Sequence, residues 1–285
     1  MIFPKEIWII VIVSLLLCSM GFKRFVWFMS VGYGVSAAGI GLTLLIMSLI
    51  KGNVSLVYLL MCITFIVYGV RLGGFLFIRE LKNEKYRAKA AEAGSEVNVP
   101  IFVSIIMWIY CGFFYVFQSS GPVYRLLNNL NNETSLFLII GTVISIMGVS
   151  IEALADKQKS DAKKINSDMP AMDGLYKLCR CPNYFGEMMF WTGAFISGIG
   201  AYQGAQWIIA IIGYAEIMII MISGGKRVET RHIKHYGDKP EYNKWANTTP
   251  LLFPFIPMYH MTSPEKIAKE EAAKKEKAAK KKNAQ

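Results

Sequence analysis

A polar run at residues 180–187 stands directly before an apolar segment, and its side chains are the first candidates for chemistry. Arg180 can bind phosphate oxygens, while Asn183 and Glu187 can accept hydroxyl and amide donors. Tyr184 can stack on a ligand or anchor at an interface. Because polar groups at a membrane helix cost free energy unless they have a partner or a task, we expect these residues to hold a ligand.

Other ionisable residues also lie within or beside apolar segments. Tyr68 and Arg71 occur in one segment, and Glu152 and Asp156 lie one helical turn apart at the end of another. Structural ion pairs would explain any single residue. The set instead favours one polar cavity, rimmed by cations and able to hold an anionic soluble ligand against a membrane-dissolved one. The basic residues expected at its rim are Lys163, Lys164 and Arg180.

Basic and aromatic residues follow the last apolar segment. Arg231, His232 and Tyr236 are candidates there for ligand contacts, and the preceding Gly224-Gly225 pair is predicted to break the helix. This region fits either an interfacial segment anchored by basic and aromatic residues or a cap over the same cavity.

The cysteines and histidines do not predict a metal site. Cys179 and Cys181 form a C-x-C without a second pair, and His232 and His235 have no obvious third ligand. The other three cysteines lie in apolar segments, where they are expected to behave as small hydrophobic residues.

The elements that must position these residues are apolar helices. The chain has 285 residues, of which 54% are hydrophobic, and its apolar residues arrive in long blocks. A membrane span needs about 20 such residues. We predict an all-α membrane protein with spans near 6–22, 26–50, 54–78, 100–118, 135–155, 185–200 and 206–223.

Charge between the blocks predicts the orientation. Lys and Arg gather after the first, third, fifth and seventh segments, whereas the alternate loops carry few. The positive-inside rule therefore places the N-terminus outside and the C-terminus in the cytoplasm. The net charge of +11 suits an anionic lipid surface or a phosphate-bearing ligand, and no nucleic-acid-binding motif is present.

The sequence divides into a membrane domain at 1–262 and a Lys/Ala/Glu-rich tail at 263–285, expected to be a solvated helix or disordered. The first apolar segment is expected to remain as a span, because no small-residue cleavage pattern follows it.

The run D-G-L-Y-K-L-C-R-C-P-N-Y-F-G-E at 173–187 resembles the C-terminal signature of the steroid 5-alpha-reductase family. It is closest to a bacterial branch of that family once catalogued as a domain of unknown function. The E-x-R-x-x-x-x-Y-G pattern at 229–237, the R-L-G after Tyr68 and the A-D-x-Q-K around Asp156 are similar to the family as well. The resemblance covers residues 65–257. Cys181 stands where the bacterial pattern has His, and no G-x-G-x-x-G follows a strand.

The resemblance implies a seven-helix fold and a reductase that uses NADPH to reduce an activated carbon–carbon double bond in a lipid enone, such as a 3-oxo-4-ene steroid. It implies that Tyr68 supplies or relays a proton to the carbonyl oxygen. Residue by residue, it implies cofactor contacts at Arg71, Asp156, Lys163, Lys164, Asn183 and Glu187. With the rim candidates, the predicted cofactor residues are Arg71, Asp156, Lys163, Lys164, Arg180, Asn183, Tyr184, Glu187, Arg231, His232 and Tyr236.

Two other functions remain open. One is a membrane methyltransferase of the isoprenylcysteine carboxyl type that binds S-adenosylmethionine. The other is a lipid-binding protein without activity. The expected partners are membrane lipids and a lipid or steroid substrate, without nucleic acid or metal, and the expected state is a monomer. A bacterial inner membrane is favoured, with the endoplasmic reticulum as the eukaryotic alternative.

Overall fold

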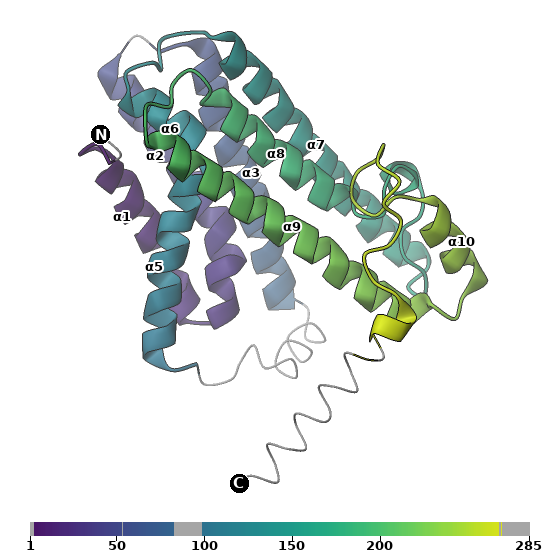
Figure 1. The fold of residues 1–285 in the computed structure, drawn as a ribbon. Helices are drawn as coiled ribbons and strands as arrows, with labels where there is room; N and C mark the ends of the chain where they lie inside the picture. Colours follow the sequence, from purple (N-terminus) through teal and green to yellow (C-terminus); the bar gives the residue numbers. More distant parts are fainter. Residues whose placement is uncertain (1–2, 53, 83–98, 268, 270–285) are drawn as a thin grey trace. The chain divides into compact units, whose positions relative to one another are not determined.

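The computed structural model describes residues 3–52, 54–82, 99–267 and 269, and the regular elements among them are all helical (Figure 1). This confirms the predicted all-α fold. Short 3-10 helices occur at Ser19–Phe22, Phe25–Met29 and Gly174–Lys177. The α-helices are α1 (Ile7–Cys18), α2 (Val31–Lys51), α3 (Leu56–Lys82), α5 (Ile101–Gln118), α6 (Ser120–Leu127), α7 (Leu136–Ile165), α8 (Pro182–Ser197), α9 (Gln206–Tyr236) and α10 (Pro240–Thr248).

Five of these helices are long and apolar enough to cross a membrane: α2, α3, α5, α7 and α9. They make the chain an integral membrane protein. The remaining two predicted spans correspond to shorter helices. One is the apolar stretch Ile7–Phe22, made of α1 and the 3-10 helix that follows it, and the other is α8. The total of seven spans and the orientation stay predictions.

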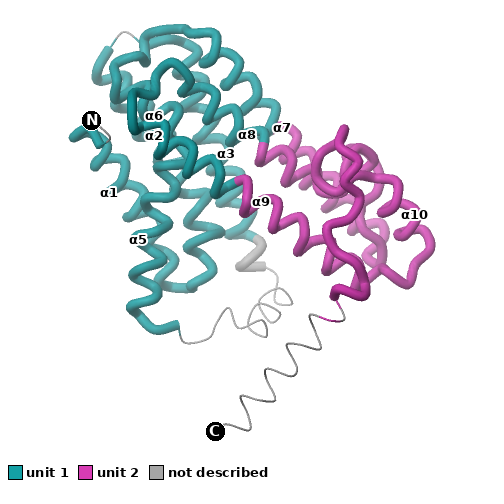
Figure 2. The backbone as a smooth tube through the Cα atoms, viewed as in Figure 1, with its two compact units in different colours: residues 1–149, 189–217 teal, residues 150–188, 218–285 magenta. Residues whose placement is uncertain are grey.

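The chain forms two compact units (Figure 2). Unit 1 comprises Met1–Val149 and Met189–Ile217, and unit 2 comprises Ser150–Met188 and Met218–Gln285. The predicted site residues are therefore divided, because Tyr68 and Arg71 belong to unit 1 and the others to unit 2.

Within unit 1, small residues let α2 and α3 approach closely. A Cβ atom on Gly34 would lie 2.5 Å from the backbone nitrogen of Gly73, and one on Gly69 would lie 2.3 Å from that of Ala38. Such contacts are typical of membrane helices packed through glycine. The glycine of the R-L-G motif therefore has a packing role beside Arg71.

Unit 2 has its own core. Buried side chains from the end of α7, the loop after it and α10 pack together, among them Ala155, Met169, Tyr176, Tyr242 and Trp245. The indole nitrogen of Trp245 donates a hydrogen bond of 3.0 Å to the backbone oxygen of Tyr176. This bond fixes α10 to the segment that precedes α8.

The prediction that Gly224 and Gly225 break the last span is wrong, because α9 continues from Gln206 to Tyr236. Both glycines serve close packing instead. A Cβ on Gly224 would lie 2.5 Å from Cε1 of Tyr184, and one on Gly225 would lie 2.9 Å from a methyl group of Leu252. The cost of glycine within a helix is offset here by contacts that a larger residue would block.

Two predicted segments fall outside the described residues. The basic loop at 83–98, on which the orientation partly depends, is one of them. Residues 270–285 of the Lys-rich tail are the other, whereas Pro264–Ile267 at its start are helical.

Candidate functional site

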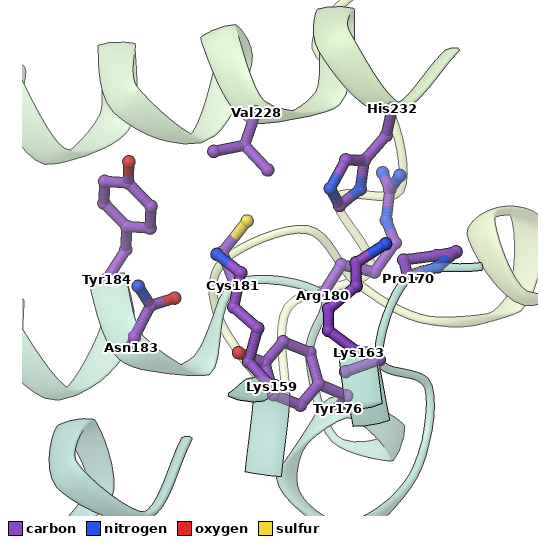
Figure 3. Close-up of a pocket in the computed structure, with 11 residues that line it drawn as sticks. Lys159, Lys163, Pro170, Tyr176, Arg180, Cys181, Asn183, Tyr184, Val228 and His232 are labelled. Carbon is purple, nitrogen blue, oxygen red and sulfur yellow. The ribbon is translucent and has the colours of Figure 1, made fainter. Parts of the chain in front are cut away.

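A small cavity in unit 2 collects residues from three helices (Figure 3). Lys159 and Lys163 come from α7, Asn183 and Tyr184 from the first turn of α8, and Val228 and His232 from α9. The segment between α7 and α8 adds Pro170, Ala171, Tyr176, Arg180 and Cys181. The cavity volume is about 30 Å³, far below the roughly 300–1,000 Å³ of ligand pockets, so the lining side chains must move apart to admit a ligand.

Pro182 at the start of α8 explains how Asn183 and Tyr184 reach the cavity. Proline is favoured in the first turn of a helix because its missing N–H leaves no donor unpaired there. The backbone N–H groups of Arg180 and Cys181 bond to the carbonyl oxygens of Pro250 and Leu251 at 2.8 and 2.9 Å. The chain that enters α8 is thereby held beside the C-terminal segment.

Arg180 is buried and fixed by a carboxylate. Its Nη2 donates to Oε1 of Glu229 at 2.8 Å and also to the backbone oxygen of Tyr259. The side chains are 2% and 0% exposed. Nε of Arg180 has no hydrogen-bond partner among the described residues.

Glu229 organises the C-terminal segment as well. Its Oε2 accepts the backbone N–H groups of Met261 and Thr262 at 2.9 and 3.1 Å, and its Oε1 accepts from Nδ1 of His260 at 3.0 Å. A buried carboxylate with this many donors is well compensated for its lost hydration.

Lys163 is a structural donor at the edge of the cavity. Its ammonium group donates to the backbone oxygens of Ser167 and Met169 and, at 2.7 Å, to the hydroxyl of Tyr236. Lys163 therefore holds the loop after α7 and links it to Tyr236 at the end of α9. The charge of Lys163 still contributes to the potential of the cavity.

The acidic groups of the cavity stay protonated at neutral pH. Burial raises the pKa of the Cys181 thiol to about 12. Burial, and then the nearby Asp156, also raise the pKa of Tyr176. Cys181 is thus a neutral thiol rather than a nucleophile or a charged ligand.

Five predicted site residues line the cavity together: Lys163, Arg180, Asn183, Tyr184 and His232. The other predicted residues of unit 2 do not line it, namely Asp156, Lys164, Glu187, Arg231 and Tyr236. Lys164 is exposed and pairs with Asp161 at 2.8 Å. Arg231 is also exposed.

Tyr68 lies in an aromatic cluster of unit 1. It is fully buried, its ring stacks on Phe190 at 4.0 Å, and its hydroxyl donates to the hydroxyl of Tyr33 at 2.8 Å. The indole nitrogen of Trp191 donates to the same Tyr33 oxygen. Tyr33 is therefore the immediate partner of the predicted proton donor.

Several residues of these sites were missed from the sequence. Lys159 could have been predicted, because it lies one helical turn before Lys163 and therefore shares the same face of the helix. Glu229 opens the E-x-R pattern and could have been singled out there. Tyr33 and Tyr176 gave no signal, because tyrosine is common in apolar segments and only tertiary contacts distinguish them.

The cysteines are all free and buried. Among the residues that the structure describes, no group of three or more His, Cys, Asp or Glu side chains is placed to hold a metal ion.

Comparison with protein families gives one match. The family described as "Protein of unknown function (DUF1295)" matches residues 21–249. The comparisons with curated proteins and with solved structures give no match.

Proposed function

The chain belongs to the DUF1295 family, and we propose that it is a membrane-embedded, NADPH-dependent reductase of an activated carbon–carbon double bond in a lipid enone. The observation that carries this proposal is the cavity of unit 2, which Lys159, Lys163 and Arg180 line together. The resemblance of residues 173–187 to the steroid 5-alpha-reductase signature supplies the reaction class.

The residues present fit a phosphate-bearing ligand. Arg180, Lys159 and Asn183 line the cavity, and guanidinium, ammonium and amide groups are donor types suited to phosphate oxygens. Tyr184 presents an aromatic face beside these donors, on which a ring of the ligand can stack.

The charge of the cavity distinguishes NADPH from S-adenosylmethionine. NADPH carries three phosphate groups, whereas S-adenosylmethionine carries a cationic sulfonium centre. Cations lining a partly buried site favour the anionic ligand, because charges interact more strongly there than in water. This argues against the methyltransferase alternative.

The bound cofactor would supply the hydride, and the chain's own residues then have positioning tasks. Glu229 holds Arg180 at the phosphate-binding position. For the proton, we retain Tyr68, whose hydroxyl can donate to a carbonyl oxygen on which negative charge develops. Tyr33, at 2.8 Å, is placed to share the proton of Tyr68.

Thermal unfolding of the detergent-purified protein tests the proposal. NADPH, NADH and S-adenosylmethionine are each added separately. A ligand present at 100 times its Kd adds roughly 2.7 kcal/mol to the free energy of unfolding. We expect a rise in Tm with NADPH. A rise with S-adenosylmethionine alone would overturn the assignment in favour of a methyltransferase, and no rise with any ligand would favour a lipid-binding protein.

A further inference from the structure

The segment at 250–262, here called the strap, is tied to unit 2 at both ends (Figure 1, yellow). At one end, its residues Pro250 and Leu251 accept backbone hydrogen bonds from Arg180 and Cys181. At the other, Met261 and Thr262 donate to Glu229. Between them, Leu251 N–H bonds to the oxygen of Met258 at 2.8 Å and closes the strap into a loop.

The tip of this loop, residues 254–258, is apolar and exposed. Phe255 is 92% exposed and Ile256 is 49% exposed, and Met258 is exposed too. Exposure of such a cluster to water is unfavourable, because moving each large apolar side chain out of water lowers the free energy. The tip also contains Pro254 and Pro257, which carry no N–H group that would need a partner in an apolar environment.

The contacts of the strap relate its tip to α8 and α9. Phe253 packs against Phe185 at 6.4 Å between ring centroids, and Leu252 packs against Gly225. Phe185 begins the apolar part of α8. Gly225 lies between the apolar part of α9 and its first cations, Lys226 and Arg227.

We propose that the strap tip inserts into the boundary between lipid headgroups and acyl chains of the bilayer that the chain spans. Aromatic side chains favour this depth, and the neighbouring Lys226 and Arg227 match anionic headgroups. The strap is hydrogen-bonded to the backbone of Arg180, which lines the cavity. Anchoring the tip in the bilayer would therefore help to hold this side of the cavity in place. This inference does not depend on the proposed reaction.

Site-specific fluorescence in vesicles tests the insertion. Phe255→Cys is labelled with a nitrobenzoxadiazole dye in the full chain, reconstituted in phosphatidylcholine and phosphatidylglycerol. The native cysteines are buried, so the unsubstituted chain serves as the labelling blank. Lys244→Cys, at an exposed position of polar α10, is the matched control, and Ile256→Cys provides a second tip position.

At both tip positions we expect quenching by spin-labelled lipid carrying its label near the headgroup, with protection from aqueous iodide. The label at position 244 should respond in the reverse way. Iodide quenching at the tip as strong as at position 244 would place the tip in water and overturn the proposal. Protection of the tip from both quenchers would also overturn it, because protein, such as a second copy of the chain, would then cover the tip.

Discussion

Arg180 and Glu229 form a buried ion pair of 2.8 Å from side chains that are 49 positions apart in the sequence. Arg180 precedes α8 and Glu229 lies on α9, so the pair joins two of the segments that form the cavity of unit 2. Glu229 also accepts the backbone of the strap. One carboxylate thus fixes both the guanidinium of the site and the segment beside it.

Removing this carboxylate charge is expected to destabilise the protein. Glu229→Gln leaves Arg180 as a buried cation without its counter-charge, and loss of one partner of a buried pair costs about 3–5 kcal/mol. The measurement is thermal unfolding in detergent, with Glu241→Gln at an exposed position of α10 as the control. A Tm for Glu229→Gln equal to that of the control would show that Arg180 is compensated by other groups.

Two lysines of α7 provide a matched test of the cavity. Lys159 lines it, whereas Lys164 is exposed and pairs with Asp161. Lys159→Ala should weaken NADPH binding, since it removes a cation from the proposed phosphate site, and Lys164→Ala should leave the affinity unchanged. Kd values from titration of the Tm shift decide between them. Equal losses in both variants would indicate a general effect of net charge rather than a defined site.

The hydroxyl of Tyr68 is expected to act in turnover. Tyr68→Phe keeps the stack on Phe190 and removes the proton, so kcat should fall by about 10²–10⁴-fold, while NADPH affinity stays constant. Tyr33→Phe should give a smaller loss of kcat, because Tyr68 keeps its own proton but loses its partner.

The assay is NADPH oxidation with steroid and other lipid enones. Phe65, which packs near Phe190 and carries no hydroxyl, provides a control for packing through Phe65→Leu. Full activity in Tyr68→Phe would mean that the proton comes from another donor, such as water.

Gly224→Ala should alter the cavity without breaking α9. The new Cβ would lie 2.5 Å from the ring of Tyr184, so this ring must move, at a cost of about 1–3 kcal/mol for overpacking. Both the Tm and the NADPH-induced shift should fall. Gly74→Ala is the control because no atom lies within 4 Å of the added methyl group. An unchanged NADPH shift in Gly224→Ala would remove Tyr184 from the ligand site.

Alkylation of Cys181 should depend steeply on pH. Only the thiolate reacts, and burial raises the pKa of this thiol from 9.0 to about 12. Below pH 9 the folded protein therefore holds about a thousandfold less thiolate at this position than an unfolded chain does. Reactivity towards iodoacetamide should be negligible at pH 8 and rise only as the pH approaches 12.

Mass spectrometry after timed exposure at several pH values measures this reaction at Cys181. The same chain unfolded in detergent and urea is the reference. Rapid alkylation of the folded protein at pH 8 would show that Cys181 is an exposed or activated thiol.

Much of the helical fold could be predicted because apolar blocks are a strong signal. Each of the seven predicted segments corresponds to a helix, with α1 and α8 shorter than a full span. The sequence did not predict the short helices α6 and α10, because neither contains an apolar run as long as those of the other helices. The glycine pair at 224–225 led to a wrong prediction of a helix break. Low helix propensity favours a break, but here the two glycines allow Tyr184 and Leu252 to pack closely against a continuous helix.

Only those parts of the candidate site that are close together in the sequence could be predicted. Arg180, Asn183 and Tyr184 share one sequence run, so their proximity is local. The contacts of Arg180 with Glu229 and with the backbone of Tyr259 join distant segments, and they depend on how α9 and the strap pack. No spacing along the chain reveals such contacts.

The hydrogen bond between Trp245 and Tyr176 has an optical consequence. Five of the six tryptophans belong to unit 1, and Trp245 alone belongs to unit 2, bonded to a residue that lines the cavity. The emission of tryptophan overlaps the absorption of reduced nicotinamide. A bound dinucleotide would therefore receive excitation energy from Trp245, and Trp245→Phe identifies the share of that transfer which arises in unit 2. Transfer from Trp245 would thus report on occupancy of the proposed cofactor site without an added label.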